Sequence, residues 1–137
     1  MSRRTSTGGV FEESIRLSLL HGGYSVKMQQ HVGVRLGGGK HLVDIVAEKS
    51  DEKILISLKW QQSSGTAEQK VPYEYICLAE TLDRFTAYSR AYLVLGGNGW
   101  TKRDFFIDGL SSWINTSNSI EVIEGNEFIA LANSAKI

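Results

Sequence analysis

Two short apolar strands joined by a tight polar turn constrain the fold of this chain more than any other feature. They lie within residues 42–61, LVDIVAEKSDEKILISLKWQ. Residues 42–47 and 54–60 are rich in β-branched and apolar side chains, and the segment between them, residues 50–53, has the composition of a turn. The pattern therefore predicts a β-hairpin that turns near residue 51.

Each strand of this hairpin carries one charged residue that could take part in catalysis or metal binding. Asp44 lies in the first strand and Lys59 ends the second, so the hairpin would bring them close together, with Ser57 on the same face as Lys59. A carboxylate can hold a divalent cation, and a lysine can stabilise negative charge or orient a water at a phosphodiester. A cross-strand ion pair, or two solvated side chains, explains the same residues without any function.

The chain length of 137 residues suffices for one compact domain with one core. We expect a single domain over residues 1–137, with a flexible polar arm over residues 1–8. The formal net charge of zero argues against a nonspecific polyanion binder, but not against a DNA enzyme with a local basic surface. The one cysteine, Cys77, is expected in the core. Without a membrane-length apolar run or a signal segment, a cytoplasmic protein is expected.

Apolar periodicity predicts further elements on both sides of the hairpin. Helices are predicted over residues 10–21, 67–85, 100–113 and 126–135, and strands over residues 24–36, 91–95 and 120–123. The predicted order is helix, three strands, helix, strand, helix, strand, helix. Such an order favours an α/β fold with a mixed central sheet flanked by helices. The histidines have no ligand-like spacing and are interpreted as surface residues; they are His21, His31 and His41.

This order of elements, together with Asp44 and the tripeptide SLK at residues 57–59, resembles the PD-(D/E)XK nuclease superfamily. Its motif is an acid on the second strand of a three-stranded meander, then acid-x-lysine on the third strand. The spacing from Asp44 to Ser57 is similar to that of archaeal Holliday-junction resolvases. The segment FEESIRLSLLHGGYSV is similar to their opening helix, in which a glutamate, here Glu12, often contributes to the metal site. The resemblance covers residues 8–96 and implies a restriction endonuclease-like core.

Two residues depart from the family motif. Val43 replaces the proline before the acid, and Ser57 replaces the acid of the tripeptide. The second departure matters more, because a hydroxyl is a poor magnesium ligand. A subgroup of type II restriction enzymes has a similar SxK tripeptide and takes the missing carboxylate from the following helix. By that analogy Glu74 is the replacement acid, and Glu68 is the second choice.

The resemblance implies a DNA endonuclease, of restriction, homing or junction-resolving type, that depends on Mg²⁺, with Mn²⁺ as a substitute. The implied metal site consists of Asp44, Glu74 and the Leu58 carbonyl, with Glu12 in support. Lys59 would stabilise charge at the scissile phosphate, and Gln61 would lie near that phosphate. Three basic residues are candidates for contact with the DNA backbone: Lys70, Arg3 and Arg4.

The implied oligomeric state is a homodimer, because one such domain has one site and cuts one strand. Exposed aromatic residues such as Trp100, Phe105 and Trp113 would serve that contact, although the helical pattern also places them in the core. Two alternatives stay open. Ser57 argues for a nuclease-fold module that binds DNA or assembles without catalysis, and an interaction domain in which Asp44 and Lys59 are structural also fits the sequence.

Overall fold

The computed structural model describes residues 7–137. Its helices are α1 (Thr7–His21), α2 (Ala67–Arg84), α3 (Arg103–Asp108) and α4 (Gly125–Asn133), with a short 3₁₀ turn, η2 (Leu110–Ser112). Its strands are β1 (Ser25–Val34), β2 (Lys40–Lys49), β3 (Glu52–Trp60), β4 (Tyr88–Gly96) and β5 (Ile120–Glu124). The predicted order of elements and the α/β class are confirmed.

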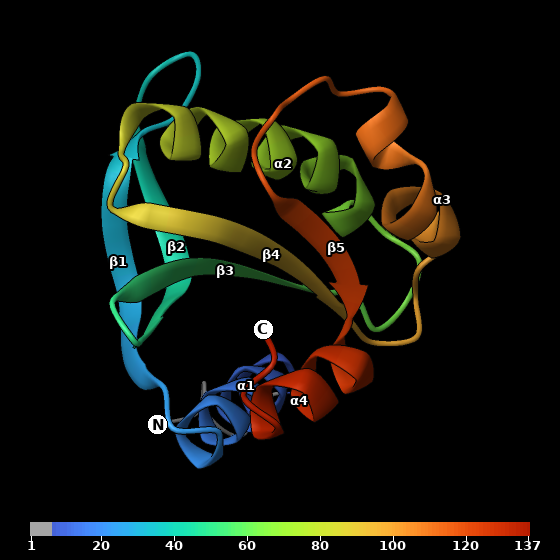
Figure 1. Cartoon of the computed structure of the whole chain (residues 1–137). Coiled ribbons are helices and arrows are strands. Elements are labelled where there is room, and N and C mark those ends of the chain that lie inside the picture. Colours follow the sequence, from blue (N-terminus) through green and yellow to red (C-terminus); the bar gives the residue numbers. More distant parts are fainter. Residues whose placement is uncertain (1–6) are drawn as a thin grey trace.

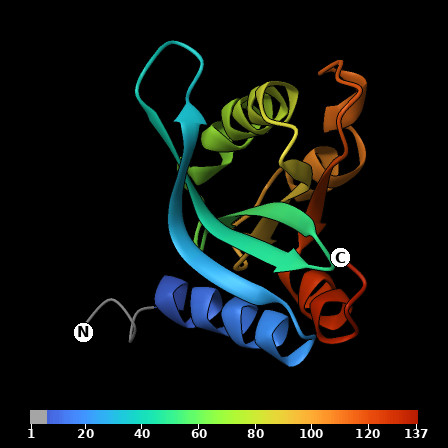
Figure 2. The ribbon, with the colours of Figure 1, turned by 60° about the vertical axis from the view of Figure 1, so that its left-hand side comes forward.

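The sheet has the order β1-β2-β3-β4-β5. Strands β1, β2 and β3 form an antiparallel meander, whereas β4 runs parallel to both β3 and β5. In Figures 1 and 2 the sheet lies between two helical layers, with α1 and α4 on one face and α2 and α3 on the other. Alternate apolar residues of the strands therefore supply two cores, one beneath each helical layer.

The strands of the central hairpin illustrate this division. Ile54 and Ile56 join the core under α1 and α4, and Leu55 joins the core under α2 and α3. The second core also receives an apolar stripe from α2, as the sequence predicts: Val71, Tyr75, Leu78 and Leu82. Cys77 is buried, as predicted. Within residues 7–137 no helix is both long enough and apolar enough to span a membrane.

Two predicted boundaries are corrected. The arm expected over residues 1–8 lies outside the described residues except for its last two, Thr7 and Gly8, which belong to α1. The helix expected over residues 100–113 is only the six-residue α3 followed by η2. α3 buries Phe106 and η2 buries Leu110, but two expected core residues lie outside: Phe105 is 44% exposed and Trp113 is 78% exposed.

The candidate site lies where β2 and β3 stop pairing and separate, a point called the fork from here on. Their ladder runs from Lys49↔Glu52 to Ile45↔Ile56 and stops there. Beyond that pair β2 remains bonded to β1, and β3 remains bonded to β4. The fork therefore opens where the chain places Asp44 on one strand and Ser57 on the other.

Candidate functional site

The carboxylate of Asp44 lies in this fork. One of its oxygens, Oδ2, accepts a hydrogen bond from the backbone N–H of Leu58 at 2.7 Å, so that a side chain continues the contact between the two strands. Burial raises the pKa of Asp44, and the negative charge of Glu12 adds to this, while the Leu58 N–H and the charge of Lys59 oppose it. No cationic side chain within residues 7–137 pairs with Asp44 inside 4 Å. The site thus holds a carboxylate that a bound cation would stabilise.

Gln29 joins Asp44 to Glu12. Its amide Nε2 donates to Glu12 Oε2 at 3.1 Å and lies 3.5 Å from Asp44 Oδ1. The backbone of Gln29 has φ 52, in the left-handed region, and the β1–β2 register omits it between Met28 and Gln30. A left-handed non-glycine residue within a strand is strained, and such strain clusters at functional sites. The sequence offered only one signal for Gln29, which is that a polar pair interrupts the apolar alternation of this strand.

A cavity of about 380 Å³ opens beside these two carboxylates. It is lined by the start of α1 and by the fork: Gly8, Gly9, Phe11, Glu12, Gln29, Asp44, Leu58 and Trp60. The structure therefore brings the predicted Glu12, Asp44 and Leu58 to one cavity. It does not bring Glu74 into the lining of that cavity.

Glu74 instead lies buried on α2, where it contacts Ser57 and His41. Its Oε2 accepts a hydrogen bond from Ser57 Oγ at 2.6 Å and lies 3.1 Å from His41 Nε2. Burial acts to raise the pKa of Glu74, but the hydrogen bonds from His41 and Ser57, with the charge of Lys59, outweigh it and lower the pKa. Ser57 thus holds a buried carboxylate from α2, on which the charge of Lys59 also acts.

His41 contradicts its interpretation as a surface residue. The side chain is fully buried, and its Nδ1 lies 3.0 Å from Thr81 Oγ1, opposite the contact with Glu74. The Thr81 hydroxyl in turn lies 3.0 Å from the carbonyl oxygen of Cys77. The imidazole therefore ties β2 to two turns of α2, through Glu74 and Thr81. No spacing in the sequence signals this contact, because its partners are far along the chain.

Lys59 acts on both carboxylates. Its charge lowers the pKa of Asp44 and that of Glu74, which places its ammonium within electrostatic reach of each. The side chain is half-buried, and within the described part of the chain it forms no ion pair shorter than 4 Å. A lysine in such a setting can bind an incoming anion without first breaking an internal ion pair.

Two other predicted residues, Gln61 and Glu68, do not line the cavity of Asp44 but hold the surrounding chain in place. The Gln61 amide donates to Gly99 O at 2.8 Å and accepts from Glu68 N at 3.3 Å. The Glu68 carboxylate accepts the backbone N–H groups of Thr101 and Lys102, so Glu68 anchors the loop before α3. Lys70 is exposed on α2, and Arg3 and Arg4 lie outside the described residues.

The donor set at the fork suits Mg²⁺. No group of three or more His, Cys, Asp or Glu side chains that could hold a metal ion is found within residues 7–137. Mg²⁺, however, usually takes one or two carboxylates and completes its shell with waters and substrate phosphates. Asp44 and Glu12 offer two carboxylates at one cavity, and burial raises the pKa of Asp44 even though the charge of Lys59 acts to lower it.

Comparison with known proteins identifies the family of this chain. The family model of a PD-(D/E)XK nuclease superfamily domain matches residues 3–136. The fold is similar to that of a solved protein of unknown function, AF1548, with a TM-score of 0.54 and 13% sequence identity; the match covers 88% of this chain and 64% of that one. None of the curated proteins compared with the chain is significantly similar to it. Members of the matched superfamily are generally nucleases and usually use divalent metals. The chain belongs to the PD-(D/E)XK nuclease superfamily.

Proposed function

We propose that this protein is a metal-dependent DNA endonuclease that hydrolyses phosphodiester bonds, with residues 1–137 as one nuclease domain. The observation that supports it best is the bond between Ser57 and Glu74. Ser57 replaces the motif acid, yet its hydroxyl holds the buried carboxylate of Glu74 at 2.6 Å. The charge of Lys59 acts on that carboxylate and on Asp44 alike. On this proposal an SxK tripeptide with an acid from the next helix would retain the charges of the family motif.

Asp44 and Glu12 would hold the cation, Mg²⁺ or Mn²⁺, and the Leu58 carbonyl and Glu74 are its further candidate ligands. Bound there, the ion would polarise a phosphate and lower the pKa of a water. Gln29 keeps Glu12 and Asp44 together by its contacts with both. The Leu58 N–H orients the Asp44 carboxylate. These contacts fix the acids before substrate arrives, which is the main contribution a protein makes to such a site.

Lys59 would bind the scissile phosphate and stabilise the charge that develops on it. Its ammonium has no ion-pair partner within 4 Å in residues 7–137, so a phosphate would meet a cation that is already available. Glu74 would hold the ammonium in place from the α2 side, since the two charges attract. Gln61 would act indirectly, because one end of its amide is bonded to the loop at Gly99 and the other to the first turn of α2 at Glu68.

DNA is the proposed substrate, with Lys70, Arg3 and Arg4 as contacts to its backbone. One domain contributes one site, so cleavage of both strands would need a homodimer. The exposed rings of Phe105 and Trp113 are the apolar surface proposed for that contact. Restriction, homing and junction-resolving enzymes share such a core, and loops and oligomer geometry distinguish them.

A cleavage assay tests the proposal. Supercoiled, branched and linear DNA are incubated with the protein in Mg²⁺, in Mn²⁺ and in EDTA. Cutting is expected only with metal, and Asp44→Ala and Lys59→Ala should each abolish it without loss of helical circular dichroism. Asp108→Ala and Lys27→Ala, which change exposed residues, are the matched controls. Cutting that persists in Asp44→Ala would exclude the proposed site.

The second candidate function is a DNA-binding or assembly module without catalysis. The presence of Ser57 in place of the motif acid favours it, as does the lack of a three-acid group in residues 7–137. Gel shifts in EDTA, with no cleavage in either metal, would establish it. Absence of any DNA affinity would instead leave a protein interaction domain.

A further inference from the structure

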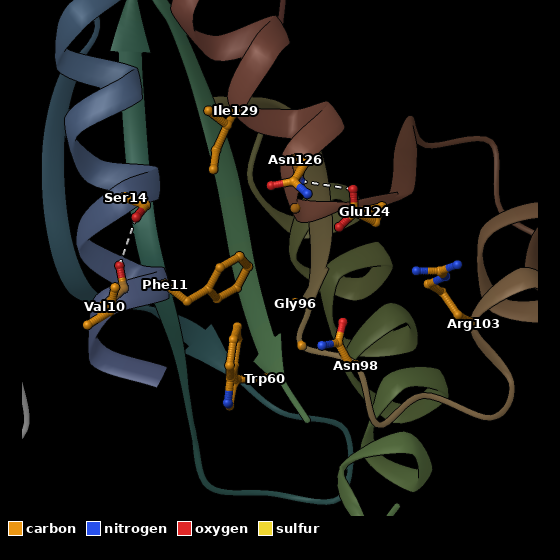
Figure 3. A pocket seen from close by; sticks show the side chains of 12 residues that line it. Val10, Phe11, Ser14, Trp60, Gly96, Asn98, Arg103, Glu124, Asn126 and Ile129 are labelled. Carbon is orange, nitrogen blue, oxygen red and sulfur yellow. Dashed lines mark hydrogen bonds between the residues drawn. The ribbon is translucent and has the colours of Figure 1, made fainter. Parts of the chain in front are cut away.

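A second pocket adjoins the cavity of Asp44. Its volume is about 440 Å³, and it shares Phe11 and Trp60 with the cavity that holds the two carboxylates. Figure 3 shows these two rings on one side, with Asn98, Glu124 and Asn126 across from them. A ligand that extends from the Asp44 cavity along these rings would enter this pocket.

The apolar side of the pocket suits a flat ring. The Phe11 and Trp60 rings have centroids 5.3 Å apart and are tilted by 40°. The backbones of Gly96 and Gly125 pack against the edge of the Phe11 ring, since a Cβ at either glycine would lie 2.7 Å from a Phe11 ring carbon. Phe11 is only 9% exposed, so the half-buried Trp60 is the ring on which a base would stack. Stacking of a base on an aromatic ring contributes about 1–3 kcal/mol and tolerates any base. The volume also lies within the usual range for a small-molecule site.

The polar side of the pocket suits the edge of a base rather than a phosphate. Asn98 and Asn126 are exposed, and their amides make no hydrogen bond within the described chain. Glu124 places a carboxylate on the same side, and that carboxylate would repel an anion. A carboxylate instead accepts from an exocyclic amino group, and an asparagine amide recognises adenine by two hydrogen bonds. Arg103, farther out in Figure 3, lies 3.9 Å from the Asp104 carboxylate in a loose, exposed ion pair, and it is the cation that would meet a flanking phosphate.

From this arrangement we infer that the pocket receives one unstacked base of the substrate, and that it favours a base with an exocyclic amino group over thymine. The inference rests on the proposed nuclease function, because DNA held at Asp44 is what brings a base to this pocket. Turning a base out of a duplex costs a few kcal/mol, least at a mismatch, a branch or a single strand. The pocket would therefore favour DNA that is already distorted.

Nucleotide binding in EDTA tests the inference without any cleavage. The full chain, labelled with ¹⁵N, is titrated with dAMP, dCMP, dTMP and inorganic phosphate. We expect saturable NMR shifts of Gly96, Gly125 and the side-chain amides of Asn98 and Asn126 with dAMP and dCMP. Asn98→Ala should weaken this binding by about tenfold. The control Asn133→Ala, at the far end of α4, should leave it unchanged.

Equal binding of dTMP, competition by inorganic phosphate alone, or no saturable shift with any nucleotide would overturn the base pocket. Unweakened binding in Asn98→Ala would overturn it as well. The cleavage assay is run in parallel on the same preparation. Metal-dependent cutting without nucleotide binding would overturn the pocket and leave the nuclease function standing. Binding of the expected pattern in a protein that cuts no DNA would support the pocket and overturn the nuclease function.

Discussion

His41→Ala should destabilise the protein strongly, because it removes the partner of a buried carboxylate. His41 is fully buried, the Glu74 side chain is 6% exposed, and 3.1 Å separates His41 Nε2 from Glu74 Oε2. Leaving a buried group without its hydrogen-bond partner costs about 1–3 kcal/mol, and more where that group is charged, as the Glu74 carboxylate is. Glu74 would keep its bond to Ser57, so we expect a loss of about 3 kcal/mol. In a chain of this size that loss lowers the Tm by roughly 10 °C.

Urea unfolding at pH 7, followed by circular dichroism, measures this loss. The matched control is His31→Ala, which changes an exposed histidine on β1 and should cost less than about 0.5 kcal/mol. The double variant His41→Ala with Glu74→Ala should be about 1–3 kcal/mol more stable than the sum of the single losses predicts. A loss below about 1 kcal/mol in His41→Ala, or strictly additive losses, would refute the reasoning.

Three further predictions concern the same region. The pKa of Asp44 is raised, so the native state binds the proton of this carboxyl more tightly than the unfolded chain does. Asp44→Asn should therefore increase the Tm at pH 7. Calorimetry should show that this gain disappears once the pH falls below 3.8, the ordinary pKa of an aspartate. The pKa of Glu74 is lowered, so its ionised form stabilises the native state. Glu74→Gln should therefore be less stable than the unsubstituted protein above pH 4.5, and this deficit should shrink as the pH falls through the lowered pKa. A deficit that is constant with pH would contradict a stabilising Glu74 carboxylate. Gly97→Ala should lower the free energy of unfolding in urea more than Gly38→Ala does. Gly97 has φ +93 and its Cβ would lie 2.3 Å from Gln61 O, whereas Gly38 has φ +107 with open space around it and carries only the backbone cost of about 1–2 kcal/mol. Equal losses would show that the contact with Gln61 is unimportant.

The fold could be predicted from sequence where local signals agreed. Strand composition and turn chemistry defined the hairpin, and Ser50 and Asp51 do adopt positive φ at its turn. Helical spacing defined the inward face of α2. By contrast, α3 begins only after residues 101 and 102, which Glu68 holds through their backbone N–H groups, and no local pattern predicts that contact.

The candidate site, too, could be predicted from the sequence only in part. Hairpin register predicted Asp44 and Lys59 nearly opposite each other. The ladder stops at Ile45↔Ile56, and the same register continued by one pair would set Ser57, rather than Lys59, opposite Asp44. Which glutamate of α2 lies against Ser57 depended on how the helix packs on the sheet. The bond from Ser57 favours Glu74, while Glu68 holds a loop.

Gln29 and His41 could not be identified from the sequence. Gln29 reaches Asp44 through a distortion of β1, and regular alternation gives no hint of a left-handed residue there. His41 is buried because Thr81 and Glu74 satisfy its two ring nitrogens, and both come from α2. Contacts between residues so distant in sequence arise only from the tertiary fold.

The central claim is that Asp44 and Glu12 bind one divalent cation beside Lys59. Titration of the full chain with Mn²⁺, followed by electron paramagnetic resonance, tests it most directly. We expect one saturable site in the unsubstituted protein, binding weakened at least about tenfold in Asp44→Asn and more modestly in Glu12→Gln, and no change in the exposed control Asp108→Asn. Binding that is absent from the unsubstituted protein, or that is equally strong in Asp44→Asn, would contradict the claim.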